Sequence, residues 1–349
     1  MAGMSIIFKE ITDQAEWDDF VFARQFYSFL QSFNWAQFQE LNGAVVFKLG
    51  GYLNDKLVGL ALVIKVSAKR GTFLLCPHGP LVEDDYQTEF FRELTGYLKI
   101  LAKKEQADFI RLSPVLENTK ANAKMLEGIG YRFAPMHVHA ETTWLLNLSQ
   151  PEDKLMADLR KTTRYLIKRA ENEGVEITAD QSNEAIERFI ATHRAHAQKT
   201  HYEPFSAAYI RNLFKVFKSN EISLKFAVYQ GQAEAASIIV YFGKTAVYYL
   251  AATNTLHPQF SPSYLLQWRS ILEAKQRGCV LYNFWGVSPD NNPRHPIAGV
   301  SRFKMGFSGY KLDLLHAYDL PITGKYWLNW LVESGRRIAR HYYFLKPLE

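Results

Sequence analysis

The sequence predicts an α+β protein built from two copies of one unit, each a mixed sheet flanked by helices. With 349 residues, the chain is too long for one core of ordinary size, and 48% hydrophobic and 22% charged residues are typical of a globular protein. One order of elements also occurs twice, about 170 residues apart, which is far above the period of a solenoid. We therefore expect domains at 1–150 and 151–320, and a C-terminal helix over 321–349.

The first copy begins with strands, continues with a helix and ends in a buried strand. Its expected elements are a strand at 45–49, a hairpin over 51–66, a strand at 72–76, a helix over 85–104 and a strand at 109–112. The helix is well supported because its apolar residues recur at spacings of four, four and three and so share one face. These residues are Phe90, Leu94, Leu98 and Leu101.

The second copy repeats this order. Its expected elements are strands at 225–229, 237–242 and 246–251, a helix over 262–277 and a strand at 280–284. Local signals mark both ends of the helix, because Ser261 is a suitable N-cap, Pro262 suits the first helical position and Gly278 follows the end. The repeated order predicts an internal duplication.

A helix expected over 152–174 connects the copies and has a basic face. Arg160, Arg164 and Lys168 lie at positions i, i+4 and i+8, and no acidic residue occurs from 160 to 170. This face is either a solvated surface or a track for nucleic-acid phosphates, and the helix alone favours the first interpretation. A net charge of +6 at pH 7 suits a phosphate-bearing partner without requiring one.

Several kinds of chemistry find no support in the sequence. It contains no GxGxxG, P-loop, GxSxG or HExxH motif, and its 2 cysteines are too few for a disulfide framework. His193, His196 and His201 lack a flanking glutamate, so we expect no metal. No apolar run of about 18 residues occurs and the start does not resemble a signal peptide, so we expect a cytoplasmic protein.

The segment 299–307 is a candidate for chemistry. If it is extended, Arg302 and Lys304 lie on the same side of an apolar, glycine-containing stretch. A lysine there either stabilises the negative charge that develops on an ester oxygen during acyl transfer or extends from a strand edge into solvent. Trp285 and Gly286 are a second candidate, because they follow a buried strand and open into a polar loop.

Several short segments occur in one order along nearly the whole chain: Phe29-Leu30-Gln31-Ser32 with Trp35, Gly79-Pro80, 159–165, Ser261-Pro262, 278–286 and Arg302-Phe303-Lys304-Met305-Gly306-Phe307. Taken together, these segments resemble the Fem family of peptidoglycan bridge aminoacyltransferases. The resemblance implies two tandem acetyltransferase-like (GNAT) domains. It also implies transfer of Gly, Ala or Ser from aminoacyl-tRNA to an amine of a peptidoglycan precursor, either lipid II or its nucleotide-linked form, with no metal or organic cofactor.

The resemblance assigns roles to individual residues. Lys304 would stabilise charge near the tRNA terminus, and the backbone carbonyl of Phe303 would position or deprotonate the acceptor amine. The tRNA-binding candidates are Arg160, Arg164 and Lys168. The substrate-binding candidates are Trp35, Gln39, Tyr209, Tyr249, Trp285 and Arg302.

Three positions on the acceptor side depart from the family pattern. Gln39 and Phe205 stand where basic residues are frequent, and Ser113 stands where an aspartate is frequent. We expect no coiled-coil arm, because the roughly 50 residues after the basic helix lack sustained heptads. Two other functions stay open: a coenzyme A dependent N-acyltransferase, although no glycine-rich pyrophosphate loop opens either main helix, and a nonenzymatic RNA-binding protein.

The C-terminal helix, expected over 324–344, is rich in aromatic and basic residues. Its apolar side contains Trp327, Leu331, Ile338 and Tyr342, and its basic residues are Arg336, Arg337 and Arg340. The favoured interpretation is a helix docked on the second domain. The alternative is peripheral contact with the anionic inner face of the membrane, which a lipid II acceptor would require.

Overall fold

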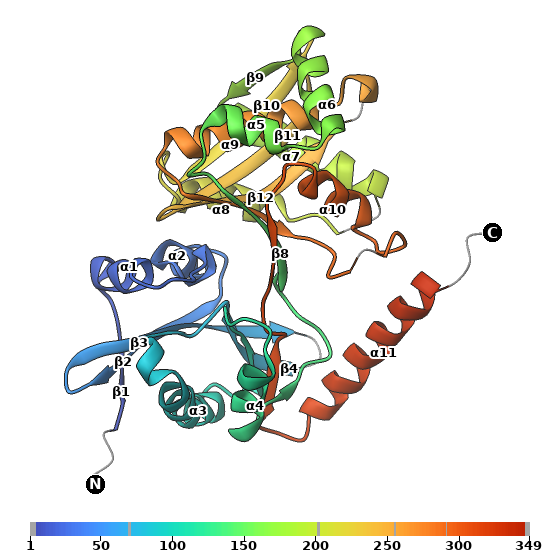
Figure 1. The fold of residues 1–349 in the computed structure, drawn as a ribbon. Helices are drawn as coiled ribbons and strands as arrows, with labels where there is room; N and C mark the ends of the chain where they lie inside the picture. Colours follow the sequence, from blue (N-terminus) through green and yellow to red (C-terminus); the bar gives the residue numbers. More distant parts are fainter. Residues whose placement is uncertain (1–4, 69–70, 201–202, 255, 291, 346–349) are drawn as a thin grey trace. The chain divides into compact units, whose positions relative to one another are not determined.

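The chain folds into two compact units (Figure 1). The computed structural model describes residues 5–68, 71–200, 203–254, 256–290 and 292–345. Unit 1 comprises Met1–Glu141 and Asp313–Glu349, and unit 2 comprises Thr142–Leu312. Each unit is a mixed sheet flanked by helices, which confirms the predicted α+β class. The division differs from the expected boundaries at 150 and 320, because the C-terminal segment belongs to unit 1.

In unit 1, α1 and α2 lie on one face of the sheet, and α3 and α4 lie on the other (Figure 1). The sheet order is β1-β2-β3-β4-β6-β15-β7, and β5 pairs with β3. The helices are α1 (Gln14–Phe22), α2 (Phe33–Leu41), α3 (Gln87–Lys104), α4 (Lys120–Gly128) and α11 (Tyr326–Leu345). The strands are β1 (Ile7–Glu10), β2 (Val45–Leu53), β3 (Lys56–Ala68), β4 (Gly71–Pro77), β5 (Leu81–Val82), β6 (Phe109–Ser113), β7 (Arg132–Phe133) and β15 (Tyr318–Pro321).

The core of unit 1 forms where α3 packs against the sheet. The four apolar residues that predict this helix are all buried, together with side chains of β3, β4 and β6. A second anchor is Gln31, whose side-chain amide donates to the Pro77 carbonyl at 2.6 Å and accepts from the Leu62 N–H at 2.9 Å. A Cβ on Gly79 would lie 2.6 Å from Gln31 Nε2, so glycine allows this close approach.

Unit 2 has the same strand order as unit 1, which supports the predicted duplication. Its sheet order is β14-β8-β13-β12-β11-β10-β9. The helices are α5 (Glu152–Asp158), α6 (Lys161–Asn172), α7 (Asn183–Thr200), α8 (Ala207–Val216), α9 (Pro262–Gln276) and α10 (Ala298–Met305). The strands are β8 (Thr142–Asn147), β9 (Glu176–Ala179), β10 (Ile222–Tyr229), β11 (Gln232–Phe242), β12 (Thr245–Thr253), β13 (Leu281–Gly286) and β14 (Tyr310–Asp313).

The two copies exchange one strand. β8 follows the first copy in sequence but pairs with β13 in the second sheet, and β15 follows the second copy but pairs with β6 and β7 in the first. Each sheet is therefore completed by a strand from the end of the other copy. This exchange explains why the boundaries of the units differ from those expected.

The basic helix is broken, which corrects the single helix expected over 152–174. Leu159 and Arg160 are extended, with ψ angles of 152° and 143°, and separate α5 from α6. The Arg160 N–H donates to the Gly306 carbonyl at 3.0 Å. A Cβ on Gly306 would lie 2.5 Å from Thr163 Oγ1, so α6 approaches the end of α10 closely. The break lets α6 pack there.

The C-terminal helix α11 packs on unit 1, so the expected docking on the second domain is wrong. The Tyr326 ring lies 5.4 Å from the Phe109 ring, and Glu333 pairs with Arg111. The side chains of Arg340 and Tyr342 lie outside the described residues. Among the described helices, none combines the length and the apolar character that a membrane-spanning segment needs.

Candidate active site

The neighbouring parallel strands β12 and β13 separate in the middle of the second sheet. Their pairing covers Thr245 to Val247 against Leu281 to Asn283, although both strands continue further. Gly286 instead pairs with Thr143 of β8. Beyond the paired part, the ends of β12 and β13 do not pair with each other. Open strand ends of this kind are frequent ligand sites in α/β sheets.

Trp285 lies at this opening in a left-handed backbone conformation, with φ of 65°. Bulky residues rarely adopt this conformation, and it costs roughly 1–3 kcal/mol. The Trp285 N–H donates to Asn283 Oδ1 at 2.8 Å, which holds the turn. Such strain at the end of a strand is typical of functional sites, and the next residue, Gly286, presents its carbonyl to Lys304.

Lys304 lies on α10, not on a strand, which corrects the expected extended segment. The residue is 6% exposed, and Nζ donates to the Gly286 carbonyl at 2.6 Å. Burial lowers the pKa of Lys304 to about 7. Nζ also lies 6.0 Å from the centre of the Tyr248 ring. The structure thus places a buried amine at the opening between β12 and β13.

Arg302 does not lie beside Lys304. Two residues apart on a helix, their side chains point to different faces, and Arg302 is exposed. Burial raises the pKa of Tyr264, and the charges of Arg160 and Arg302 both oppose that rise. Both arginines therefore contribute positive charge to the surroundings of the Tyr264 hydroxyl. The sequence contains no signal that singles out Tyr264.

Phe303 packs through its side chain, with ring centres 4.9 Å from Tyr264 and 5.3 Å from Phe307. Its carbonyl accepts the Gly306 N–H at 3.1 Å, in the last turn of α10. One lone pair of this carbonyl therefore serves the end of the helix. A direct role toward an amine stays a prediction.

Three substrate-binding candidates form one aromatic cluster in unit 2. The Tyr209 and Tyr249 hydroxyls are hydrogen-bonded to each other, and the Tyr249 and Trp285 ring centres lie 6.3 Å apart. Phe205, which departs from the family pattern, stacks on Tyr209 at 4.5 Å. Burial raises the pKa of both tyrosines, so their hydroxyls stay protonated at neutral pH. Because Trp285 precedes Gly286, the cluster adjoins the carbonyl that binds Lys304.

The other substrate-binding candidates, Trp35 and Gln39, belong to α2 of unit 1. Trp35 is buried, with its ring centre 5.2 Å from Phe29 and 4.9 Å from Phe38, so packing accounts for it. Gln39 is half-buried. Ser113, the other departure from the family pattern, is buried at the end of β6.

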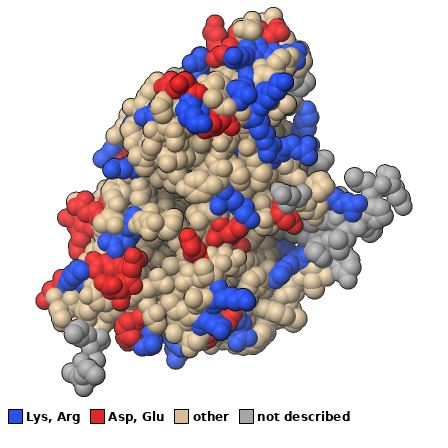
Figure 2. Space-filling model, in the orientation of Figure 1, with Lys and Arg blue, Asp and Glu red and all other residues tan. Residues whose placement is uncertain are grey.

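The candidate tRNA-binding residues differ in what their side chains do. Arg160 and Lys168 are exposed, whereas the Arg164 guanidinium donates to the carbonyls of Ala157 and Leu159. Arg164 therefore caps the end of α5 and has a structural role. Lys and Arg side chains gather on the surface over α6 (Figure 2).

The histidines of α7 do not form a metal site among the described residues. His193 is buried and stacks on Phe189, and His196 Nδ1 lies 3.2 Å from Thr253 Oγ1. His201 lies outside the described residues.

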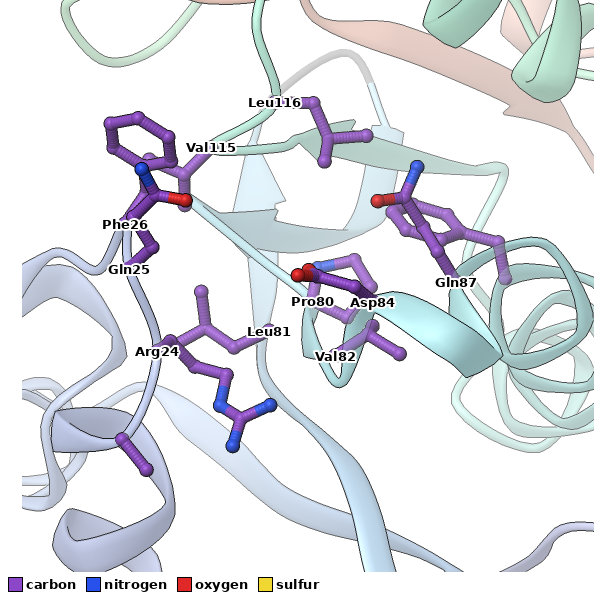
Figure 3. Close-up of a pocket in the computed structure, with 12 residues that line it drawn as sticks. Arg24, Gln25, Phe26, Pro80, Leu81, Val82, Asp84, Gln87, Val115 and Leu116 are labelled. Atoms are coloured by element: carbon purple, nitrogen blue, oxygen red, sulfur yellow. The ribbon is translucent and has the colours of Figure 1, made fainter.

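Unit 1 contains a cavity of about 230 Å³ between the segment after α1 and the start of α3. Arg24, Asp84 and Gln87 line it, and the amides of Gln25 and Gln87 face each other across it (Figure 3). A wider groove of about 910 Å³ in unit 2 follows α6, α9 and β9. Lys304 lines neither of these two cavities.

The sequence model of the FemAB family matches residues 12–231 and 229–334. The chain belongs to the FemAB family. Aminoacyltransferase FemA from Staphylococcus epidermidis is 34% identical over 77 residues, which are 22% of this chain and 18% of that protein. FemA from Staphylococcus aureus matches to the same extent. The chain thus spans about a fifth of the length of these curated relatives.

Solved structures support the tandem GNAT-like fold of this FemAB protein. A structure of FemX has a TM-score of 0.79 at 16% identity and covers 94% of this chain and all (100%) of that one. A tandem GNAT protein from the clavulanic acid biosynthesis pathway has a TM-score of 0.59 at 14% identity, with 91% and 99% coverage. At these identities the likeness concerns the fold alone, and it confirms the predicted architecture.

Proposed function

We propose that this FemAB protein transfers an aminoacyl group from aminoacyl-tRNA to an amine of a peptidoglycan precursor. The buried Lys304 at the opening of β12 and β13 carries the proposal. An ammonium has three N–H donors, and the Gly286 carbonyl takes one of them. The others can stabilise an oxyanion in a site where water is largely excluded.

In the proposed step, the acceptor amine attacks the ester carbonyl carbon of the aminoacyl-tRNA. A C–N bond forms, the C–O bond to the terminal ribose breaks, and the proton lost by the amine balances the proton gained by the ribose oxygen. Lys304 stabilises the charge that develops on oxygen. Tyr209, Tyr249 and Trp285 supply the adjoining aromatic surface, and the Phe303 carbonyl is proposed to orient the amine.

The choice of donor distinguishes this function from that of an acetyltransferase. The purified protein is mixed with labelled aminoacyl-tRNA, and separately with labelled acetyl-CoA, in the presence of lipid II or the nucleotide-linked muramyl peptide. We expect consumption of the tRNA donor alone and a product whose mass gains one Gly, Ala or Ser residue. Consumption of acetyl-CoA, or binding of tRNA without transfer to either acceptor, would contradict the proposal.

We expect Arg160, Lys168 and Arg302 to contact tRNA phosphates, because all three are exposed in unit 2 and the first and last act on Tyr264. The triple variant to alanine should bind tRNA more weakly and should flatten the plot of log affinity against log salt by about 0.7–0.9 per lost contact. The test is to measure tRNA binding at salt concentrations from about 50 to about 200 mM, where affinity depends strongly on phosphate contacts.

The matched control replaces three exposed lysines of α3 in unit 1, Lys99, Lys103 and Lys104. It removes the same net charge, so a salt slope that falls equally in both triple variants would indicate a general charge effect.

Arg164→Ala should destabilise the junction of α5 and α6, since its guanidinium holds two carbonyls there.

We further propose peripheral membrane contact through α11, whose apolar side chains are exposed. Leu328 and Leu331 are 66% and 61% exposed, and Trp327 lies beside them. Arg336 and Arg337 are exposed on the next turns, a composition that suits an anionic interface. We expect salt-sensitive binding to vesicles that contain anionic lipid.

Leu328→Ser with Leu331→Ser should abolish this vesicle binding. A substitution is preferable to truncation, because Tyr326 and Glu333 of the same helix contact the core of unit 1. Ile100→Ser is the control, because Ile100 is also exposed, at 72%, but lies on α3. Equal binding by the double variant and the native protein would contradict the role of α11, and no binding by either would favour a soluble nucleotide-linked acceptor.

A further inference from the structure

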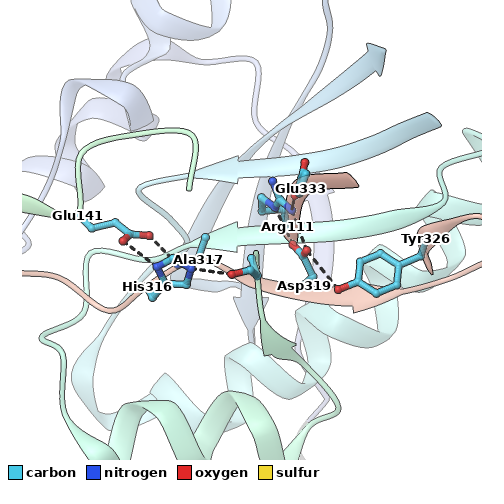
Figure 4. Close-up of polar contacts among 8 residues, drawn as sticks. Arg111, Glu141, His316, Ala317, Asp319, Tyr326 and Glu333 are labelled. Carbon is cyan, nitrogen blue, oxygen red and sulfur yellow. Dashed lines mark hydrogen bonds and ion pairs between the residues drawn. The ribbon is translucent and has the colours of Figure 1, made fainter. Parts of the chain in front are cut away.

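Two histidines converge on one carboxylate in unit 1, away from the residues assigned to transfer. His316 Nδ1 lies 2.8 Å from Glu141 Oε2, and His137 Nδ1 lies 3.3 Å from the same oxygen. The ligand atoms of the three residues all lie within 4.8 Å of one another. Glu141 Oε1 accepts the Ala317 N–H at 2.9 Å, which holds the carboxylate in this orientation (Figure 4).

The contacts of His316 indicate which of its ring nitrogens is able to bind an ion. Nε2 lies 2.8 Å from the Ala134 carbonyl oxygen, which only accepts, so Nε2 carries a proton. Nδ1 is then the nitrogen of His316 that can offer a lone pair to an ion held beside Glu141. His137 Nδ1 faces the same oxygen at 3.3 Å.

The three ligand atoms lie close enough together for one metal ion to contact all of them. We propose that His137, Glu141 and His316 bind a divalent metal ion of the zinc class. Two imidazole nitrogens and one carboxylate oxygen form a ligand set that zinc accepts, with a fourth position left for water. His137 is exposed, which gives the ion a route of entry.

The surroundings suit such an ion. A ligating histidine usually donates its other N–H to a carbonyl or carboxylate, as His316 does to Ala134. The Phe133 ring stacks on His316 with 3.8 Å between ring centres and fixes the plane of the imidazole. Ligand atoms in a tetrahedral zinc shell lie roughly 3.3 Å apart. A displacement of Glu141 by about half an ångström would therefore lengthen its 2.8 Å contact with His316 to the spacing found in a zinc shell.

The site would join the two segments through which the chain leaves and re-enters unit 1. Glu141 is the last residue before unit 2, and His316 follows the return at Asp313. The Leu314 N–H already donates to the Glu141 carbonyl at 2.8 Å, and the Ala134 N–H to the Ala317 carbonyl at 2.9 Å. A bound ion would add a link between side chains of these segments and stabilise unit 1 by mass action.

The test is a calorimetric titration of the full chain with Zn²⁺ after treatment with a chelator. We expect one equivalent to bind and the midpoint of thermal unfolding to rise. His137→Ala and Glu141→Gln should each weaken binding by at least about 100-fold, since even partners outside the ligand shell contribute 10–100-fold. Glu141→Gln keeps a side-chain oxygen for the Ala317 N–H, which protects the fold.

His257→Ala is the matched control, because His257 Nδ1 lies 2.8 Å from Glu234 without a second histidine in that pair. It should leave zinc binding and the zinc-dependent rise of the unfolding midpoint unchanged. Mg²⁺, which prefers an oxygen shell, should not bind. The proposal would be overturned by the absence of zinc uptake, or by equal uptake in the native protein and both site variants, which would leave the three residues as a hydrogen-bonded cluster without a metal.

Discussion

Lys304→Ala is expected to slow aminoacyl transfer by about 100-fold or more while the fold stays intact. One preorganised donor to a developing oxyanion contributes about 3 kcal/mol to the stability of the transition state. The loss should appear in a single-turnover experiment with saturating aminoacyl-tRNA, because chemistry and not binding is affected. Circular dichroism and thermal unfolding of the variant provide the control for folding. Native turnover by Lys304→Ala would contradict the role of this residue.

The pH dependence of the same reaction tests which form of Lys304 acts. Burial lowers its pKa from 10.5 to about 7, so the ammonium is lost as the pH rises through about 7. If the ammonium stabilises the oxyanion, the part of the rate that depends on Lys304 falls above that pH. A rise through pH 7 that is absent in Lys304→Ala would instead indicate a neutral amine that accepts a proton.

The same shift has an effect of known sign on stability. The unfolded chain keeps the Lys304 proton up to about pH 10.5, whereas the folded chain releases it near pH 7. Between these values the unfolded state binds more protons, so the contribution of this group to the free energy of unfolding rises with pH. Lys304→Met should remove that rise while it retains the apolar stem.

Helices with a regular apolar face could be predicted from the sequence. The spacing of Phe90, Leu94 and Leu98 predicts α3, because burial of one helix face depends on a pattern within the helix itself. The strand exchange could not be predicted in this way. No strand was expected at Thr142–Asn147, and a local pattern there could not have identified its partner, because pairing with β13 arises only when the second copy folds.

The segment with Lys304 shows why the candidate site was only partly predictable. The glycines of this segment favour an extended conformation, yet Gly299 lies in the helix α10. A Cβ added at Gly299 would meet no heavy atom within 4 Å outside its own helix backbone, so this position does not require glycine. Ser301 Oγ accepts the Ser288 N–H and donates to the Ile297 carbonyl, which stabilises α10 through a loop 13 residues distant in sequence. The residue type identified Lys304, but its separation from Arg302 required the tertiary contacts.

Charge spacing alone likewise could not distinguish Arg164 from Lys168. Both occupy the basic face that the sequence predicts, and both are spaced for one side of a helix. The break at Leu159 turns carbonyls toward Arg164, so its guanidinium is used within the protein. A break of this kind depends on packing against α10, which no local periodicity reports.

Asp319→Ala is expected to lower the free energy of unfolding by about 3–5 kcal/mol, because it leaves a buried guanidinium without its main partner. Arg111 is 2% exposed, and its Nε and Nη2 donate to Asp319 Oδ1 and Oδ2 at 2.7 and 2.8 Å (Figure 4). Glu333 of α11 accepts from Nη2 at 2.8 Å. These three residues connect β6, the exchanged strand β15 and α11. Denaturant unfolding followed by fluorescence measures the loss.

Glu333→Gln should cost less than Asp319→Ala, because the Glu333 side chain is 12% exposed and water can replace part of its contact. Arg111→Met combined with Asp319→Leu provides the decisive comparison, since an apolar pair removes the unpaired charge together with its partner. That double variant should be considerably more stable than Asp319→Ala. A cost below about 1 kcal/mol for Asp319→Ala would place this pair in the range of exposed salt bridges and would mean that water reaches Arg111 in solution.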